Sequence, residues 1–180
     1  MDDRLIWMDL EMTGLDPEVQ VIVEIATVVT DGDLNIVAKG PALAIYHPPE
    51  RLEAMEEWSR SHHIASGLMD RILVSKDDTV LAEHKTLEFL KQHCEPGKHP
   101  LCGNSVWQDR RFLVKYMPEL HGFLSHRDVD VSSLKELVLR WYPQMEPFHK
   151  RKAHTALSDI MESINELKYY RDTVFVRPPA

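Results

Sequence analysis

The chain has 180 residues, of which 43% are hydrophobic and 28% charged, as expected for a globular protein large enough to bury a core. Its net charge of −8 disfavours the binding of long polyanions, because phosphate contacts dominate their affinity and require basic surfaces. An acidic protein that acts on nucleic acid is therefore expected to bind a short substrate or to concentrate positive charge locally with metal ions.

The chain also lacks the usual signs of export or membrane insertion. Its N-terminus has no basic segment followed by an apolar one, so we expect no secretory signal. The most apolar stretch, residues 19–29, contains Gln20 and Glu24 and is too short and too polar for a membrane span. Cys94 and Cys102 have no metal-ligand spacing and are expected to be reduced thiols. These features predict a cytoplasmic protein without membrane contact.

Three β-strands are predicted in the first quarter of the chain. Residues 5–11 are rich in large apolar side chains and end at a turn signal in residues 13–17. Residues 19–30 are rich in β-branched side chains and predict a second strand. Asp31-Gly32-Asp33 then predicts a hairpin turn, which leads into a third strand over residues 34–46.

The pattern becomes helical after a pair of prolines. Leu52, Met55 and Trp58 are three residues apart, which predicts that they share one helix face. Further helices are predicted over residues 79–93, 106–117, 132–141 and 155–171, and short strands over residues 101–103 and 128–131. Ser132 is a predicted helix N-cap. This order indicates an α/β fold, with a mixed central sheet flanked by helices, in a single domain of residues 1–180.

Two acidic residues lie on the first predicted strand. Asp9 and Glu11 are two residues apart, so both carboxylates project from one face of the sheet. With 29 acidic residues in 180, such a pair is weak evidence on its own. The strand is otherwise apolar, and a buried charge is costly unless it is paired or bound to a metal. The alternative is that both acids lie solvated at an exposed strand end.

Three residues downstream extend this acidic pair. Asp109 opens a predicted helix after a Gly-Asn-Ser segment, and His154 and Asp159 have H-x-x-x-x-D spacing at the start of the last helix. The ordered set resembles the DEDDh exonucleases, a group that includes the proofreading exonuclease subunits of DNA polymerases. The resemblance implies an RNase H-like (DnaQ-like exonuclease) fold and hydrolysis of phosphodiester bonds from the 3′ end.

The chemistry of that reaction suits these residue types. Phosphodiester hydrolysis needs charge stabilisation on the attacking and leaving oxygens, which two divalent ions can provide. Mg²⁺ and Mn²⁺ prefer hard oxygen ligands. The expected ligands of two such ions are the carboxylates of Asp9, Glu11, Asp109 and Asp159. His154 is the expected general base, because imidazole titrates near neutral pH and can accept a proton from water.

A closer resemblance, to the oligoribonuclease family, covers nearly the whole chain. The similar segments are LIWMDLEMTGLDPE (5–18), DLNIVAKGP (33–41), HHIASGL (62–68), LCGNSVWQDRRFLVKYMPEL (101–120), DVSSLKEL (130–137) and AHTALSDIMESINELKYYR (153–171). This resemblance implies a homodimer that releases 5′-nucleoside monophosphates from oligoribonucleotides down to dinucleotides. We predict no further stable protein partner.

The same resemblance assigns contacts with the bases. Leu15 matches an apolar wedge between two bases, although a simple turn residue is an alternative. Trp58 and His63 match aromatic side chains that flank the terminal base, a kind of stacking that tolerates any base sequence. For Trp58, a core position on an amphipathic helix is an equally open alternative.

Another group of residues matches those that contact the 5′ phosphate of the substrate in this family. Such contacts would close the groove one nucleotide upstream of the cut, which would explain a preference for very short RNA. The members of this group are Ser105, Arg127 and Ser132. His126, also expected to contact substrate, stands beside this group where the family usually has tyrosine. Ser158 departs from the family as well, because it replaces an acid that often precedes the final metal-site aspartate.

Several interpretations remain open. The basic runs Arg110-Arg111 and Lys150-Arg151-Lys152 are either phosphate contacts or solvated surface. A DNA-directed DEDDh exonuclease, a non-catalytic RNA-binding or adaptor module on the same fold, and a phosphatase acting on nucleotides are the alternative functions.

Overall fold

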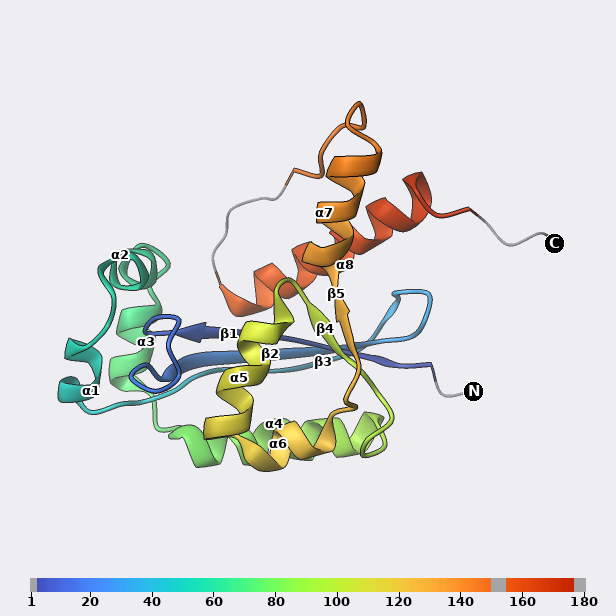
Figure 1. Cartoon of the computed structure of the whole chain (residues 1–180). Coiled ribbons are helices and arrows are strands. Elements are labelled where there is room, and N and C mark those ends of the chain that lie inside the picture. The colour runs from blue at the N-terminus through green and yellow to red at the C-terminus, as the bar shows by residue number, and fades with distance from the viewer. Residues whose placement is uncertain (1–2, 150–154, 177–180) are drawn as a thin grey trace.

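A computed structural model describes residues 3–149 and 155–176, and a five-stranded mixed sheet lies at its centre (Figure 1). The strands are β1 (Leu5–Met12), β2 (Ile22–Thr30), β3 (Ile36–Ala44), β4 (Leu101–Gly103) and β5 (Asp128–Asp130). Their order is β3-β2-β1-β4-β5, in which the first three strands pair antiparallel and β4 and β5 join β1 in parallel. The predicted mixed α/β sheet is confirmed.

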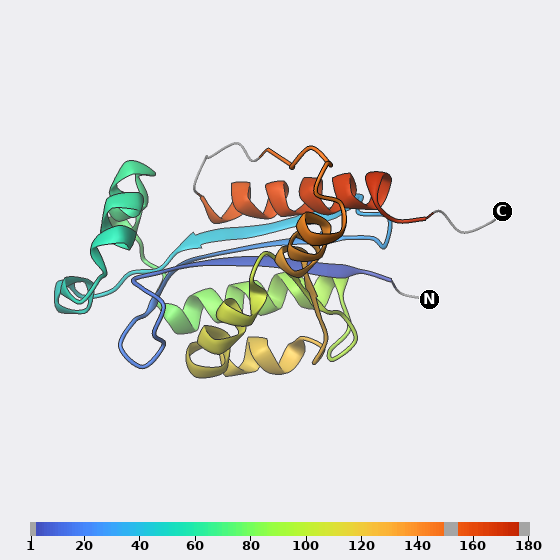
Figure 2. The same cartoon turned by 45° about the horizontal axis from the view of Figure 1, so that its top comes forward.

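Helices cover both faces of this sheet and one of its ends. They are α1 (Pro49–Glu53), α2 (Glu57–Ala65), α3 (Leu68–Val74), α4 (Thr79–His93), α5 (Val106–Tyr116), α6 (Pro118–Phe123), α7 (Val131–Trp141) and α8 (Ala156–Thr173). Figure 2 shows α8 on one face, α4, α5 and α6 on the other, and α1 to α3 at one end. None of the helices in the described part of the chain is long and apolar enough to cross a membrane.

Alternation along β1 determines which way its acids point. Ile6 and Met8 are buried in the core shared with α4, α5 and α6, whereas Trp7 is buried in the core shared with α8. Because side chains alternate between faces along a strand, Asp9 and Glu11 lie on the same face as Trp7. The strand therefore directs both carboxylates toward the helix that carries Asp159.

Two strands begin later than the sequence predicts. β2 begins at Ile22 rather than at residue 19, because residues 13–21 form a closed loop. The Thr13 amide donates to the Val21 carbonyl, and the Thr13 hydroxyl donates to the Gln20 side chain. β3 covers Ile36–Ala44, since Leu34 has a φ of 66° in the left-handed region at the end of the predicted turn.

The prediction of one helix through Leu52, Met55 and Trp58 was wrong. The chain forms two short helices, α1 and α2, and Glu56 between them is extended. A long-range hydrogen bond from the Glu56 amide to the Thr13 carbonyl holds this break. Leu52 and Met55 are buried, but Trp58 is 69% exposed, so the core alternative for Trp58 is also excluded. α3 was not predicted.

The N-cap of α7 was also predicted incorrectly. Its cap is Asp130, whose carboxylate accepts hydrogen bonds from the Ser132 and Ser133 amides. Ser132 lies inside the first turn of the helix. Asp and Ser are comparable capping residues, so the local sequence did not distinguish between them.

Candidate active site

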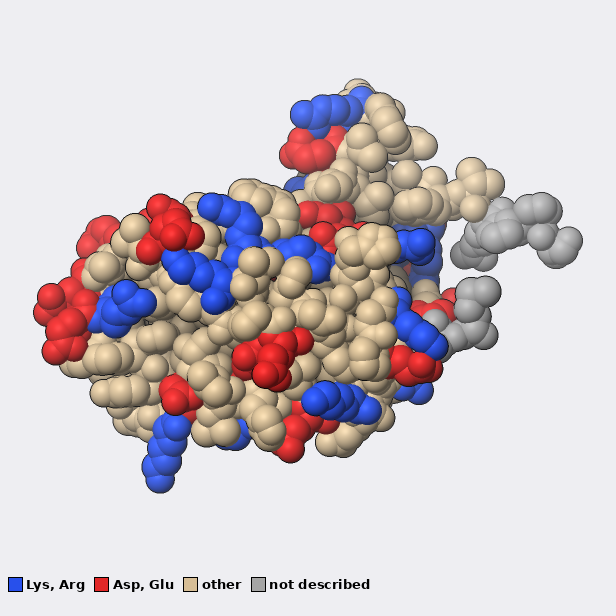
Figure 3. All heavy atoms as spheres, turned by 60° about the horizontal axis from the view of Figure 1, so that its bottom comes forward, with Lys and Arg blue, Asp and Glu red and all other residues tan. Residues whose placement is uncertain are grey.

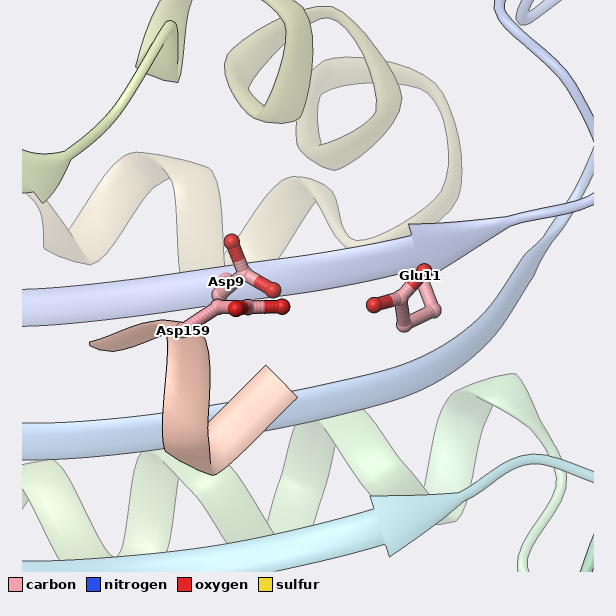
Figure 4. A group of neighbouring side chains, drawn as sticks. All are labelled: Asp9, Glu11 and Asp159. Atoms are coloured by element: carbon pink, nitrogen blue, oxygen red, sulfur yellow. The ribbon is translucent and has the colours of Figure 1, made fainter. Parts of the chain in front are cut away.

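Three carboxylates from distant parts of the chain meet beside the central strand. Asp9 and Glu11 come from β1, and Asp159 comes from the first turn of α8 (Figure 4). One oxygen from each of the three side chains lies within 4.8 Å of the other two. The predicted convergence of Asp9, Glu11 and Asp159 is therefore present in the fold.

The start of α8 is held in place by two kinds of contact. The Thr155 side chain accepts from the Ser158 amide, and the Ser158 hydroxyl in turn accepts from the Thr155 amide at 3.2 Å. This reciprocal capping box fixes the first helical turn, where Asp159 lies. Glu24 of β2 accepts from the Ala156 amide at 3.3 Å and so ties the same turn to the sheet. Ser158, the departure from the family pattern, thus has a local structural role.

Asp109 approaches the group from the other side of β1. It lies on α5, is buried, and accepts a hydrogen bond from the Leu10 amide at 2.9 Å. It is not a member of the three-carboxylate group, and one of its oxygens is committed to the strand backbone. It nevertheless lies near enough to raise the pKa of Asp9.

Burial and mutual repulsion dominate the electrostatics of these acids. Burial, followed by the charge of Asp159, raises the pKa of Glu11 to about 8. Burial raises the pKa of Asp109 to about 7. The pKa of Asp9 is also raised well above its usual range, first by burial and then by the charge of Asp109. The four acids therefore form a site where added negative charge is unfavourable and a cation is favoured.

The positively charged side chain of Arg71 lies near the acids but does not neutralise them. Arg71 of α3 contacts Glu24 at 2.5 Å, and its charge lowers the pKa of Glu11, although less than burial raises it. Hard carboxylate oxygens, incomplete neutralisation and close spacing together fit a site for divalent cations such as Mg²⁺ or Mn²⁺.

A small pocket of about 170 Å³ opens beside Glu11. Leu15, Trp58 and His63 line it, as the resemblance implied for the base-binding residues. The Trp58 ring stacks on His62 with ring centroids 3.8 Å apart, and the indole is largely exposed. This arrangement offers apolar and aromatic surface next to the acids.

His63 is more buried than an ordinary stacking platform. Its Nε2 atom lies 2.9 Å from the Met12 carbonyl, and its Nδ1 atom lies 3.9 Å from a Glu11 carboxylate oxygen. Burial lowers the pKa of this histidine, which favours its neutral form. His63 therefore joins the base pocket to the acids, which the sequence pattern did not indicate.

The sequence pattern missed the residues that hold Leu15 at the pocket. Gln108 donates to the Leu15 carbonyl at 2.6 Å, and Arg111 donates to the same oxygen at 3.4 Å. Glu56 accepts from the Leu15 amide at 3.3 Å. Gln108 and Arg111 belong to the helix that carries Asp109, so one helix supports both the acid group and the exposed Leu15 side chain.

The serine pair expected at the 5′ phosphate also comes together. The Ser105 hydroxyl donates to the Ser132 hydroxyl at 3.2 Å. His126 and Arg127 are exposed immediately before β5. Arg110, a candidate phosphate contact, instead donates to Asp128 at 2.6 Å and to backbone carbonyls of the same segment.

His154, and the run Lys150-Arg151-Lys152, lie outside the described residues.

Comparison with known families identifies the class of protein. The exonuclease family matches residues 6–167, which is most of the chain. This chain therefore belongs to the exonuclease family, with an RNase H-like fold and the acidic cluster of a metal-dependent nuclease.

Curated relatives narrow that class further. Oligoribonuclease from Dichelobacter nodosus is 53% identical over 98% of this chain and 97% of its own length. The oligoribonucleases of Marinobacter nauticus and Coxiella burnetii are each 56% identical, over 96% and 94% of this chain and 97% and 93% of their own lengths. At this identity and coverage, the chain is a member of the oligoribonuclease family.

Solved structures support the fold at much lower sequence identity. E. coli exonuclease I in complex with a dT13 oligonucleotide carrying a 5cy group superposes with a TM-score of 0.67 at 12% identity. Exonuclease I in complex with the inhibitor BCBP gives a TM-score of 0.68 at 10% identity. Each match covers 97% of this chain but only 42% of exonuclease I, so the similarity concerns the shared fold alone.

Proposed function

We propose that this protein is a 3′→5′ exoribonuclease that hydrolyses short oligoribonucleotides, down to dinucleotides, to 5′-nucleoside monophosphates. The observation that carries the proposal is the convergence of Asp9, Glu11 and Asp159 beside a pocket lined by Leu15 and Trp58. The names of the closely similar relatives support RNA as the substrate.

The acids supply the binding part of the mechanism. Asp9, Glu11 and Asp159, with Asp109 beside them, would hold two divalent ions, Mg²⁺ or Mn²⁺. When bound, such ions supply positive charge that stabilises the attacking and leaving oxygens of the phosphodiester. Carboxylates pre-positioned by a strand and a helix N-terminus need little rearrangement to do this.

His154 is the proposed general base, five residues before Asp159 in the sequence. It removes a proton from water, whose oxygen forms a new bond to phosphorus. The bond from phosphorus to the 3′ oxygen of the preceding nucleotide breaks, and that oxygen takes up a proton. The terminal nucleotide leaves with the phosphate on its own 5′ oxygen.

The dimensions and charge of the molecule support a short substrate. The pocket of about 170 Å³ offers Leu15 and Trp58 as a platform for bases, and Ser105, Arg127 and Ser132 are the proposed contacts of a 5′ phosphate. Figure 3 shows basic side chains interspersed with acidic ones over the face formed by α4 and α6, rather than one broad basic surface. A short RNA needs few phosphate contacts and tolerates this charge pattern.

The homodimer, the cytoplasmic location, and the single domain of residues 1–180 remain predictions. Light scattering of the purified full-length chain measures the first directly, with a mass of one chain, 20.9 kDa, as the contradicting result.

Product analysis of 5′-labelled RNAs of two to ten nucleotides, with matched DNA strands and saturating Mg²⁺ or Mn²⁺, tests the function. We expect stepwise shortening of RNA from the 3′ end, fastest for the shortest strands, and mononucleotides with a 5′ phosphate. Asp159→Asn is the inactive control. Intact diribonucleotides, or faster loss of DNA, would contradict the proposal, and release of inorganic phosphate alone would indicate a phosphatase.

A further inference from the structure

A partly buried hydrogen-bond network connects the serine pair to the helix that carries Asp159. Asn104, which follows β4, donates from Nδ2 to the Ser132 hydroxyl at 3.2 Å and to a Glu166 carboxylate oxygen at 3.3 Å. The Ser163 hydroxyl contacts the Asn104 Oδ1 atom and lies 2.8 Å from the Asp159 carbonyl. One amide thus lies between the proposed 5′-phosphate contact and the metal-site helix.

Glu166 determines the orientation of that amide. Its side chain is completely buried, accepts from the Tyr170 hydroxyl at 2.9 Å, and lies 3.9 Å from the ammonium group of Lys135. The Glu166 Oε2 atom accepts the bond from Asn104 Nδ2, so it faces the NH₂ group of Asn104 rather than the amide oxygen. The remaining amide proton of Asn104 is then directed at Ser132.

This orientation controls what the Ser132 hydroxyl can do. A hydroxyl group has one proton to donate and two lone pairs to accept with. The Ser132 oxygen accepts from both Asn104 and Ser105, so both lone pairs are occupied and its proton points away from these partners. A half-buried hydroxyl held in this state is a donor suited to an anion.

Backbone donors nearby are already committed. The amides of Ser105, Ser132 and Ser133 all lie within hydrogen-bond distance of the same Asp130 carboxylate oxygen, at 3.1, 2.8 and 3.3 Å. A phosphate at this point must therefore be recognised by side chains, and the direction of the Ser132 hydroxyl proton becomes decisive.

We propose that Asn104 and Glu166 are positioning residues that orient the Ser132 hydroxyl as a donor to the 5′ phosphate of the substrate. The inference rests on the proposed function, in which the Ser105–Ser132 pair lies at that phosphate. Because Ser105 gives its hydroxyl proton to Ser132, Ser132 is the member of the pair that donates to the phosphate. It adds that discrimination of 5′-phosphorylated RNA depends on the half-buried Asn104 and the buried Glu166, which act through Ser132 rather than on the RNA.

Steady-state kinetics with one diribonucleotide, prepared with a 5′ phosphate and with a 5′ hydroxyl, tests the proposal. Asn104→Asp replaces the donor with an acceptor, so Ser132 turns its proton inward. We expect KM for the phosphorylated substrate to rise about tenfold, since a hydrogen bond to a charged group is lost. We expect kcat, and KM for the 5′-hydroxyl substrate, to stay within about twofold.

Two further variants separate positioning from loss of folding. Glu166→Gln keeps the shape of the side chain but allows the Asn104 amide to flip, so it is expected to reproduce the KM effect with an intact thermal transition. Tyr170→Phe removes another hydrogen bond from the same carboxylate but leaves Asn104 in place, and it is the matched control with near-normal KM.

The outcomes distinguish the inference from the function on which it rests. If the wild-type protein prefers the 5′ phosphate and both Asn104→Asp and Glu166→Gln keep that preference, the positioning role is wrong. Equal losses with both substrates in these variants would also overturn it, because they would indicate general damage. If the wild type shows no preference, the 5′-phosphate contact itself fails, and the positioning role fails with it.

Discussion

The two halves of the candidate site hold their polar groups in opposite ways. In the acid half, the half-buried Asp9 and Glu11 lie among like charges, and both have raised pKa values. In the serine half, Asn104, Ser105 and Ser132 are joined to one another by hydrogen bonds. The acid half is therefore incomplete until cations bind, whereas the serine half is already organised by the chain itself.

This difference indicates how each half responds to change. Removing one acid from a repulsive cluster relieves repulsion among the remaining charges in the metal-free protein, so function is lost while the fold is retained. A side chain removed from a satisfied network leaves a buried partner without its hydrogen bond, which costs stability or misorients a neighbour.

The largest effect is expected for Asp159→Asn. Loss of one carboxylate from the cluster removes charge needed to hold the cations, which contribute several kcal/mol of transition-state stabilisation. We expect kcat on a diribonucleotide to fall by about 10³-fold or more. The melting temperature without metal should not fall. The control is Asp172→Asn, a 60%-exposed acid at the other end of the same helix, which should keep full activity.

Metal addition and pH should together change the thermal stability. A carboxyl group whose pKa is raised in the folded state binds more protons there than in the unfolded chain, so stability falls as pH rises between the two values. For Glu11 the window runs from 4.5 to about 8, and for Asp109 from 3.8 to about 7. The metal-free melting temperature should therefore decrease from pH 6 to pH 8.

Saturating Mg²⁺ or Mn²⁺ should reverse this loss, because cations bind the deprotonated carboxylates. We expect the melting temperature to rise by roughly 5–10 °C at pH 8, and by less at pH 6. Glu11→Gln should flatten the pH dependence of the metal-free protein. An unchanged melting temperature with and without either metal would contradict the view that the acid half is incomplete without cations.

Much of the acid half could be predicted because it depends on local geometry. Side-chain alternation placed Asp9 and Glu11 on one strand face, and the start of the last helix was predicted within one residue of where α8 begins. Asp109 was predicted in the first turn of a helix that begins at Val106, and it lies there. These features follow from periods of two and 3.6 residues, which a single sequence shows directly.

The supporting contacts could not be predicted because they join residues far apart in the chain. Glu24 and the Ala156 amide are separated by 132 residues, and Gln108 and Leu15 by 93. The helix break at Glu56 depends on a bond to Thr13, so the three-residue spacing of the neighbouring apolar residues was misleading. Sequence pattern shows which residue types are present but not which partners reach them.

A smaller effect is expected at the edge of the acid half, at the base pocket. Leu15 is 64% exposed, so Leu15→Ala removes little from the core. If its side chain packs against a base, KM for a diribonucleotide should rise about 5–30-fold, the equivalent of about 1–2 kcal/mol. Metal affinity, measured by calorimetry, should be unchanged. Val19→Ala, at a 53%-exposed position in the same loop, is the control. An equal KM for both variants would contradict a contact between the Leu15 side chain and a base.

The smallest effect is expected for Ser158→Ala, which tests whether organisation by the chain extends into the acid half. The substitution removes the hydrogen bond from the Thr155 amide but leaves the Thr155 side chain able to cap the Ser158 amide. We expect a loss of about 0.5–1 kcal/mol in the free energy of unfolding by urea, and kcat within about twofold of wild type.

The control for this variant is Ser133→Ala, an exposed serine in the first turn of α7, where the Asp130 side chain provides the cap. It should leave the free energy of unfolding unchanged. If Ser158→Ala instead lowered kcat as strongly as Asp159→Asn, the position of Asp159 would depend on the capping box as much as on the cations. The acid half would then be organised in the same way as the serine half, and the distinction between them would not hold.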